Sequence, residues 1–456
     1  MSETEGTGNP MRATMDIERS SEPERTASRL MSESDQERES RMSKMSRHST
    51  FAPLMPTNSK YLTTFMLLNY MIGAGILNQP YVVKESGILG AFGGFALATY
   101  MTWKTVNFIT DAGLKVDIYD YSELALHAFG TTGEKTIDFS ITLSLFGALI
   151  SYLIVIGGVL TSLLSSWGCT SEICSSNIVI IIAVCVFVAP LCLFRHFGHL
   201  AILSVFSVGA IWTVMFLVLF AGPSYQVPTD GNITIFNPAG TLRSLGSMIF
   251  ALSICTGNFQ AFVSTDKKSQ NSKDWGTVTA SAIGFGSTMC LGMGTAGYLY
   301  FRQDTDGVII NNFTAPAFDF FKVMIVMHLI CYLPAAFVVM RYSVVKLTLG
   351  QISEKLPLAL HTFVSLGLVA IITFVVIILQ SSGLSSGSAF SLVLDLTGGV
   401  AGSLTSFILP SAIYLKMFPE EADGSNRFRR TEAQAIFYIG IILMITILFM
   451  SVHSVV

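Results

Sequence analysis

Hydrophobic residues gather in long runs along this chain, and short polar stretches separate the runs. A helix of about 20 apolar residues can cross the roughly 30 Å hydrocarbon core of a bilayer. Eleven runs reach this length, and they begin near Tyr61, Ile88, Thr136, Asn177, Gly198, Gly240, Trp275, Pro316, Pro357, Gly387 and Thr431. The pattern predicts an all-α membrane protein with eleven transmembrane helices in a domain over residues 59–456.

Residues 1–58 differ in composition from the rest, because they are rich in serine and charge and poor in aromatic residues. Such a segment cannot bury enough apolar surface to fold. It also lacks the apolar core of a signal peptide. We therefore expect a disordered, cytosolic N-terminal tail. Basic residues precede Ser28 and Ser32, which favours phosphorylation by a cytosolic kinase; the alternative is a solvated tail without a regulatory role.

The distribution of charge supports this orientation. The chain is 51% hydrophobic and only 12% charged, about half the charged share usual for soluble domains. Beyond residue 60, thirteen Lys and Arg residues fall in segments placed inside, and the four placed outside are Lys84, Arg243, Arg302 and Lys322. This excess obeys the positive-inside rule. The C-terminus is then extracellular or lumenal, and both the plasma membrane and a vacuole or lysosome fit this topology.

Two further features belong to the segments placed outside. The glycosylation sequons at Asn232 and Asn312 both fall there. Cys169 and Cys174 share an outer loop, where an oxidising compartment allows a disulfide; free thiols are the alternative. The other five cysteines lie in apolar runs and are expected to be small buried hydrophobes, so no metal site is predicted.

The first apolar run contains an interruption. Residues 67–83, LLNYMIGAGILNQPYVV, include Gly73 and Gly75, which permit unusual dihedral angles, and Pro80, which removes a hydrogen bond one turn earlier. Within a bilayer a helix can unwind only where the freed backbone groups line a cavity or are buried in protein. The stretch predicts two half-helices that meet near the midplane. The alternative is that the glycines only allow close helix packing.

Two half-helices that meet in a bilayer can form a binding site. The N-H groups at a half-helix N-terminus favour a carboxylate, and freed carbonyls favour a cation. A similar interruption recurs in the sixth run, where polar or small residues cluster at Ser253, Cys255, Thr256, Gly257 and Asn258. A second broken helix five spans after the first is typical of inverted repeats in secondary transporters. We therefore expect a 5+5 inverted repeat followed by an eleventh helix.

Several longer motifs resemble one family. NYMIGAGILNQPYVVKESG resembles the first-helix signature of the amino acid/auxin permease family, SYLIVIGGVL its third helix, and LDLTGGVAGSLTSFILPSAIYLKM its tenth helix. The resemblance covers nearly all of residues 58–455. This family lies within the amino acid-polyamine-organocation superfamily, which shares the bacterial leucine-transporter (LeuT-like) fold. The motifs indicate the family without indicating which amino acid is carried.

The resemblance implies a set of site residues. Backbone groups around Gly73, Ala74, Gly75 and Ile76 would receive the substrate carboxylate. The residues from Ser253 to Asn258 would face the amino group and side chain, and we expect Phe259 and Tyr152 to line the same pocket. In sodium-coupled members, an Asn at the position of Asn69 and a Thr on the eighth helix are tied to the cation. Here Tyr332 stands two residues before Pro334 in place of that Thr, which favours H+ over Na+ as the coupling ion.

A proton-coupled protein needs a titratable group near its cavity. We place Asn69 and Ile72 with His328 and Tyr332 in the coupling set, because His328 titrates near neutral pH and precedes Tyr332 by one turn. The alternative for His328 is a hydrogen-bonded core histidine. Asp395, in the tenth-helix motif, is interpreted as a packing or capping partner.

The resemblance thus implies a secondary active transporter of neutral or broad-range amino acids that works by alternating access. No nucleotide-binding loop, nucleophile elbow or metalloprotease motif occurs, so we expect no enzyme activity, no cofactor and no nucleic-acid partner. The expected partners are an amino acid and the lipid bilayer. The alternatives are an amino-acid sensor that signals through its tail, a sodium-coupled symporter and a pore-type channel.

Overall fold

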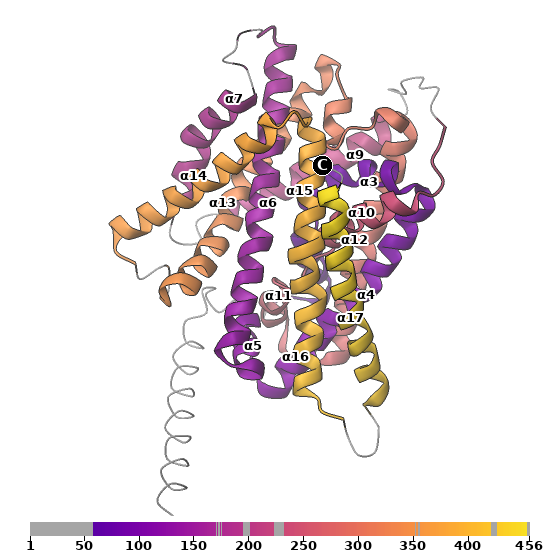
Figure 1. Ribbon diagram of the computed structural model, residues 1–456, viewed down its shortest axis with the longest axis vertical. Coiled ribbons are helices and arrows are strands. Elements are labelled where there is room, and N and C mark those ends of the chain that lie inside the picture. Colours follow the sequence, from indigo (N-terminus) through magenta and orange to yellow (C-terminus); the bar gives the residue numbers. More distant parts are fainter. Residues whose placement is uncertain are drawn as a thin grey trace, which may run out of the picture. The chain divides into compact units, whose positions relative to one another are not determined.

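The computed structural model describes the chain almost entirely as helices (Figure 1). The described residues are 58–169, 171, 174, 176–194, 201–222, 232–351, 353, 356–420 and 426–453. The predicted tail, except for Asn58, lies outside them. Within the described part, one isolated backbone bridge joins Asn58 to Thr265.

The first half of the fold begins with two short helices joined by a 3-10 turn. The elements up to the middle of the chain are α2 Lys60–Met71, η1 Ala74–Asn78, α3 Gln79–Ser86, α4 Ile88–Val116, α5 Tyr121–Phe129, α6 Thr131–Ser166, α7 Ser176–Ala183, the π-helical η3 Val184–Val188, α8 Ala189–Cys192 and α9 Ala201–Ala221.

The second half again begins with two short helices and ends with the long helix α17 (Arg427–His453). Its elements are α10 Pro238–Ala251, α11 Asn258–Ser264, η6 Lys267–Ser269, α12 Ser272–Phe301, η7 Arg302–Asp304, η8 Ile309–Asn312, η9 Pro316–Phe318, α13 Asp319–Leu349, α14 Leu358–Ser381, α15 Ser386–Leu396, the π-helical η11 Thr397–Gly402 and η12 Leu404–Ile408, α16 Leu409–Met417 and α17 Arg427–His453.

Local chemistry sets several of these helix boundaries. Asp120 begins α5 by accepting from the Glu123 amide at 3.0 Å, and Asn271 begins α12 by accepting from the Asp274 amide at 2.9 Å. Side chains of this kind satisfy N-H groups that a helix start leaves unpaired. α13 ends at Gly350, whose φ of 62° is readily adopted by glycine.

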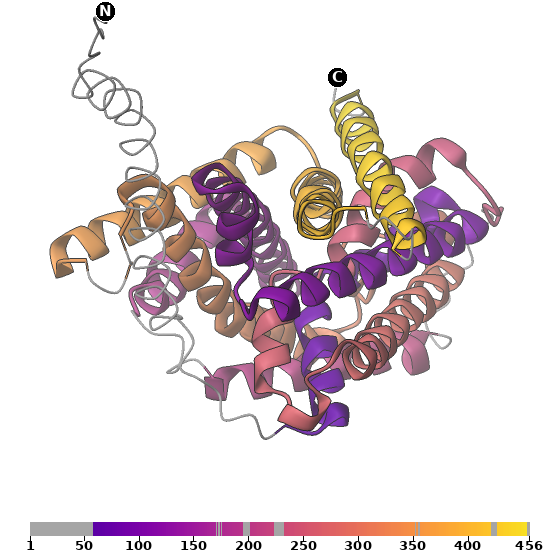
Figure 2. The same ribbon diagram turned by 90° about the horizontal axis from the view of Figure 1, so that it is seen from below.

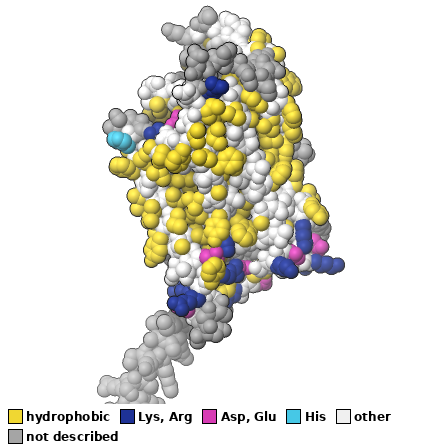
Figure 3. Space-filling view, turned by 90° about the vertical axis from the view of Figure 1, so that its right-hand side faces the viewer, with side chains coloured by type: hydrophobic (Ala, Val, Ile, Leu, Met, Phe, Trp, Pro, Cys, Tyr) yellow, Lys and Arg dark blue, Asp and Glu magenta, His cyan; other side chains and the backbone are white. Residues whose placement is uncertain are grey.

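Long apolar helices give the domain a hydrophobic exterior. Five segments are long and apolar enough to cross a membrane by length and composition: Thr131–Ser166, Pro316–Leu349, Leu358–Ser381, Ser386–Met417 and Arg427–His453. Figure 3 shows a wide hydrophobic surface with Lys and Arg gathered along its lower edge. This arrangement is that of a multi-pass membrane protein. The total of eleven spans stays a prediction.

Two elements of the first interrupted run, η1 and α3, lie inside the domain. η1 packs against α10, α12 and α15, and α3 packs against α10 and α12. α6 packs along α13 and α15, and α17 packs against α16 (Figures 1 and 2). The long helices therefore surround the two interrupted segments.

Candidate functional site

The α-helix of the first run ends at Met71 and begins again at Gln79. Ile72 still donates to the Leu68 carbonyl at 2.9 Å, whereas the Gly73 amide bonds back to Met71. Pro80 occupies the second position of α3, where the missing N-H of proline costs nothing. Two helices and a 3-10 turn thus replace one continuous helix.

The glycines of this stretch differ from their predicted role. Gly73 has φ −104° and ψ −157°, an extended conformation open to any residue, and the glycines with positive φ among the described residues are Gly87, Gly130, Gly168, Gly350 and Gly383. The expectation that Gly73 and Gly75 supply unusual dihedral angles is therefore wrong. Space is tight at Gly75, where a Cβ would lie 3.2 Å from the Phe250 ring, whereas a Cβ on Gly73 would make an ordinary contact at 3.6 Å from the Tyr152 hydroxyl.

Backbone groups at the interruption are available for a ligand. In a 3-10 turn the first N-H groups have no acceptor within the turn, which here concerns Ala74 and Gly75. The Gly75 carbonyl accepts from the Gln79 side chain at 2.8 Å. All residues of η1 are buried. The amides of Ala74 and Gly75 therefore form a candidate carboxylate site near the positive end of η1.

The sixth run is also interrupted. α10 ends at Ala251 and α11 begins at Asn258. The intervening stretch contains turns with hydrogen bonds between residues three apart, such as the bond from the Gly257 amide to the Ile254 carbonyl at 3.1 Å. The hydroxyl groups of Thr256 and Tyr70 lie 2.7 Å apart. This hydrogen bond joins the last turn of α2 to the interruption between α10 and α11.

Three tyrosines and a histidine surround this meeting point. The Tyr152 ring meets the Tyr332 ring edge-on with centroids 5.8 Å apart, and His328 stacks on Tyr332 at 5.7 Å. Tyr152 is buried, while Tyr70 is 40% exposed. Helices α2, α6 and α13 thus bring Tyr70, Tyr152 and Tyr332 toward the unwound Gly73.

The structure places the remaining predicted pocket residues in contact with other helices of the domain. The Asn258 side chain donates to Thr110 and accepts from Trp275, each at 3.0 Å. The Phe259 ring meets the Tyr119 ring at 6.3 Å, the Cys255 thiol donates to the Ser406 carbonyl, and Ser253 shares a hydrogen bond with the Ser406 hydroxyl at 2.9 Å. Their assignment to the substrate pocket stays a prediction.

The predicted coupling residues adjoin the end of α2. Oδ1 of Asn69 is buried and accepts no hydrogen bond from the described residues. Ile72 is the first residue past α2, and His328 is buried. Asn69 and Ile72 therefore precede Gly73 along the chain. His328 and Tyr332 lie on α13, where Tyr332 contacts Tyr152.

The residues predicted for covalent modification lie away from this site. Cys169 and Cys174 form a disulfide. Asn232 is exposed, whereas the Asn312 side chain accepts from the Asp306 amide at 2.9 Å and donates to the Asp304 carbonyl at 2.7 Å. A glycan at Asn312 would compete with the second of these bonds.

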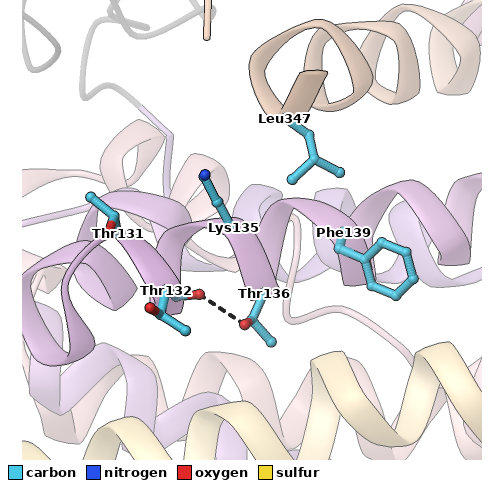
Figure 4. A pocket seen from close by; sticks show the side chains of 6 residues that line it. All are labelled: Thr131, Thr132, Lys135, Thr136, Phe139 and Leu347. Atoms are coloured by element: carbon cyan, nitrogen blue, oxygen red, sulfur yellow. Dashed lines mark hydrogen bonds between the residues drawn. The ribbon is translucent and has the colours of Figure 1, made fainter. Parts of the chain in front are cut away.

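A surface pocket of about 400 Å³ lies elsewhere, between the start of α6 and the end of α13 (Figure 4). Thr131, Thr132, Lys135, Thr136, Phe139 and Leu347 line it. The Thr136 hydroxyl donates to the Thr132 carbonyl at 2.8 Å, so this group is already satisfied. None of the predicted substrate or coupling residues belongs to this pocket.

Charged groups gather beside this pocket. Lys346 of α13 pairs with Glu134 at 2.9 Å and with Asp138 at 3.1 Å. On the short helix α5, burial and the neighbouring Asp120 carboxylate raise the pKa of Glu123 to about 7, against the lowering effect of Lys346. This end of the molecule therefore carries a carboxyl group that titrates near neutral pH.

Comparison with solved structures defines the class of fold. The structure titled "Inward facing conformation of Mhp1" aligns over 88% of this chain and 91% of its own, with a TM-score of 0.57 and 11% identity. At this identity the likeness shows the fold alone, which is the LeuT-like fold expected from the motifs.

Comparison of sequences then identifies the family. The family described as "Transmembrane amino acid transporter protein" matches residues 57–453. The chain belongs to this family. The Danio rerio protein named "Putative sodium-coupled neutral amino acid transporter 11" is 25% identical over 392 residues, which are 84% of each chain. "Vacuolar amino acid transporter 2" of Saccharomyces cerevisiae is 27% identical over 264 residues, 54% of this chain and 53% of its own.

Sequence reasoning missed part of this site. Tyr70 precedes the interruption by three residues, and Phe250 lies directly across from Gly75. Tyr70 could have been found, because an aromatic residue beside an unwound segment is a natural pocket wall. Phe250 could not, because its proximity to Gly75 depends on the packing of η1 against α10.

Proposed function

We propose that this protein is a secondary active transporter that moves neutral or broad-range amino acids across a membrane by alternating access, with H+ as the coupling ion. The observation that carries the proposal is the meeting of the two interrupted segments at Tyr70 and Thr256. Family membership supports amino acids as the substrate class.

The geometry supports recognition of the groups that all amino acids share. A substrate carboxylate at the start of η1 would accept from the Ala74 and Gly75 amides, as anions do at helix N-termini. The missing Cβ of Gly73 leaves room in front of the Tyr152 hydroxyl, which can donate to the same carboxylate. The carbonyls at the C-terminal end of α10 and the Thr256 hydroxyl would receive the ammonium group.

Unequal packing around the site supports alternating access. On α2, Leu62, Phe65 and Tyr70 are each at least 40% exposed, and they follow one face of the helix toward Gly73. Beyond the interruption Val82 and Val83 are almost fully buried. We infer that this conformation opens on the α2 side, which the predicted topology makes cytosolic, and is closed on the α3 side.

Tyr332 supports protons as the coupling ion. Its ring stacks on His328 and meets Tyr152, so a large aromatic side chain fills the place where sodium-coupled members carry a small hydroxyl residue. A Na+ site needs several oxygen ligands around one point. His328, an ionisable residue on α13, is the coupling group predicted from the sequence.

A sodium-coupled symporter is the second candidate. The observation that favours it is Oδ1 of Asn69, which is buried and accepts no hydrogen bond within the described part of the chain. A buried acceptor without a donor is costly, and a bound cation would satisfy it. The name of the Danio rerio relative also includes sodium coupling.

Uptake into proteoliposomes tests the proposal. The full chain would be reconstituted, and radiolabelled amino acids supplied with a pH gradient, with a sodium gradient or with neither. We expect saturable accumulation with the pH gradient and no requirement for sodium. Accumulation that needs sodium would favour the second candidate. A ligand-binding chain that never accumulates substrate would instead be a sensor, and linear, unsaturable flux would indicate a channel.

A further inference from the structure

A carboxylate lies buried in a segment long enough to cross the membrane. Asp395 is in the last turns of α15, within the apolar segment Ser386–Met417, and is only 5% exposed. An ionisable residue at such a position is costly and points to function. The interpretation from the sequence, that Asp395 is a packing or capping partner, explains why the residue is buried. It does not explain why the side chain is a carboxylate and not a neutral group.

Only neutral donors bind this carboxylate among the described residues. Oδ1 of Asp395 accepts from the Ser247 hydroxyl at 2.6 Å and from the Ser247 amide at 3.0 Å. The nearby charged side chains are Arg243 on α10 and Glu85 on α3, and these two pair with each other at 3.6 Å. A buried carboxylate without an ion pair is neutralised most readily by a proton.

The hydrogen-bond network of Asp395 reaches the candidate substrate site. The Ser247 hydroxyl accepts from Nδ2 of Asn78 at 3.1 Å, and Asn78 is the last residue of η1. Asn78 is fully buried, and its Oδ1 has no hydrogen-bond partner within the described part of the chain. One serine thus links the carboxylate to the 3-10 turn that begins with Ala74 and Gly75.

Close backbone packing also couples α10 to the helix that carries Asp395. A Cβ added to Gly246 would clash with the Asp395 carbonyl, and one added to Gly398 would clash with the Gly246 carbonyl. α10 therefore touches α15 and the π-helical η11 backbone to backbone. Because packed contacts of this kind do not deform freely, a change in the hydrogen bonds of Asp395 would shift α10 and η1 together.

We propose that Asp395 is the residue that binds the coupled proton and that Ser247 and Asn78 transmit its protonation to η1; this assignment rests on the proposed transport function. The proton arrives from the side of Glu85 and Arg243 and bonds to a carboxylate oxygen. The neutral acid then donates to the Ser247 hydroxyl. The Asn78 amide, whose Nδ2 donates to this hydroxyl in the structure, then turns over, and its Oδ1, which has no partner within the described part of the chain, accepts from the hydroxyl. After reorientation the proton leaves to the cytosolic solution, and the carboxylate is restored.

Tyr81 on α3 is a further titratable group near Glu85 and Asp395. The Glu85 and Arg243 side chains are partly exposed, so the proposed entry of the proton is on their side.

The test compares pH-driven uptake with counterflow in proteoliposomes that contain the full chain. Counterflow of a radiolabelled amino-acid mixture at equal pH reports binding and reorientation without a gradient. A pH difference of about one unit can support about tenfold accumulation if one proton moves with each substrate. We expect Asp395→Asn to lower the ratio of pH-driven uptake to counterflow about tenfold and Asp395→Glu to restore part of it. Asp319→Asn, which changes another buried carboxylate, should leave the ratio as in the wild type.

Two further measurements keep the assignment falsifiable if Asp395→Asn folds poorly. Ser247→Ala removes the hydroxyl that links Asp395 to Asn78, so it should lower the ratio of pH-driven uptake to counterflow as Asp395→Asn does. Asp395→Glu keeps a carboxyl group, so it should keep substrate-linked proton flux, which a pH-sensitive dye inside the vesicles reports. An Asp395→Asn protein with normal pH-driven uptake and proton flux would overturn the assignment, as would a Ser247→Ala protein with a normal ratio of pH-driven uptake to counterflow. A wild-type chain without saturable counterflow would instead overturn the proposed transport function.

Discussion

The two helices that flank η1 come from one apolar run but are held in different ways. α3 is packed tightly: Gly297 of α12 lies against Pro80, and Gly294 lies against Gln79 and Val83. α2 exposes one face, packs its other face on α12, where Gly286 lies against Met71, and is attached at its start by polar contacts. Thr63 and Thr265 share a hydrogen bond at 3.0 Å, and Lys60 pairs with Asp274 at 2.7 Å.

The difference indicates which half-helix moves. Close backbone packing leaves no alternative arrangement of α3 without a void or a clash. Polar contacts near water exchange with solvent at small net cost, so α2 can be released. We therefore infer that α3 is part of the fixed scaffold and that α2 is the gate.

Filling the contact between α3 and α12 should have the largest effect. A Cβ at Gly297 would lie 2.6 Å from Cγ of Pro80, so Gly297→Val should destabilise the protein by about 1–3 kcal/mol through overpacking. Thermal unfolding of the purified protein in detergent measures this loss. Gly292→Val is the control on the same helix, because a Cβ at Gly292 meets nothing within 4 Å. Equal losses in both variants would contradict the tight packing of α3.

Gly73→Ala should weaken transport and leave stability nearly unchanged. The backbone of Gly73 suits any residue, so unfolding should change little. The added Cβ enters the space before the Tyr152 hydroxyl, and KM for uptake should rise about tenfold, equivalent to about 1.4 kcal/mol. Gly93→Ala, at a position with open space, serves as the control. An unchanged KM would show that Gly73 is not part of the substrate site.

Tyr70→Phe should weaken substrate binding by breaking the bond between the two interruptions. A net loss of about 1 kcal/mol is expected for one hydrogen bond, so KM should rise about fivefold. Tyr61→Phe is the matched control, because Tyr61 is 88% exposed at the start of α2. Equal KM values in the two variants would show that the contact with Thr256 has no role.

Thr265→Val should release the gate. Without the hydrogen bond to Thr63, the attachment of α2 should weaken by about 0.5–1 kcal/mol. A cysteine placed at Phe65, on the exposed face of α2, should then react faster with a water-soluble thiol reagent. Thr64→Val is the control, because the Thr64 hydroxyl bonds only within its own helix turn, to Lys60. Slower labelling in Thr265→Val would contradict the role of this contact.

The smallest effect concerns pH at the α5 end. The pKa of Glu123 is raised from 4.5 to about 7 in the folded protein, first by burial and then by Asp120. A raised pKa means that the folded state holds a proton that the unfolded state has lost, so stability should fall as pH rises from about 4.5 to 7. After allowance for solvent screening we expect about 1 kcal/mol at most. Glu123→Gln should flatten the dependence in thermal unfolding between pH 5 and 8, and an unchanged slope would contradict the raised pKa.

Some of the site could be read from sequence because its cause is local. Pro80 and the polar cluster at 253–258 favour helix ends through their own chemistry, and both interruptions were predicted at the positions where the α-helices end. The reason given for Gly73 and Gly75 was wrong, and the tight space at Gly75 comes from Phe250 on another helix.

The sequence by itself determined the family, the membrane character of the chain and the location of the interruptions, because apolar length, proline and motif are properties of neighbouring residues. Only the tertiary structure decided that Tyr70 meets Thr256 and that Asp395 reaches Asn78 through Ser247. Residues 78 and 395 lie on different helices far apart in the chain, and nothing in a single sequence specifies which buried polar groups packing will bring together.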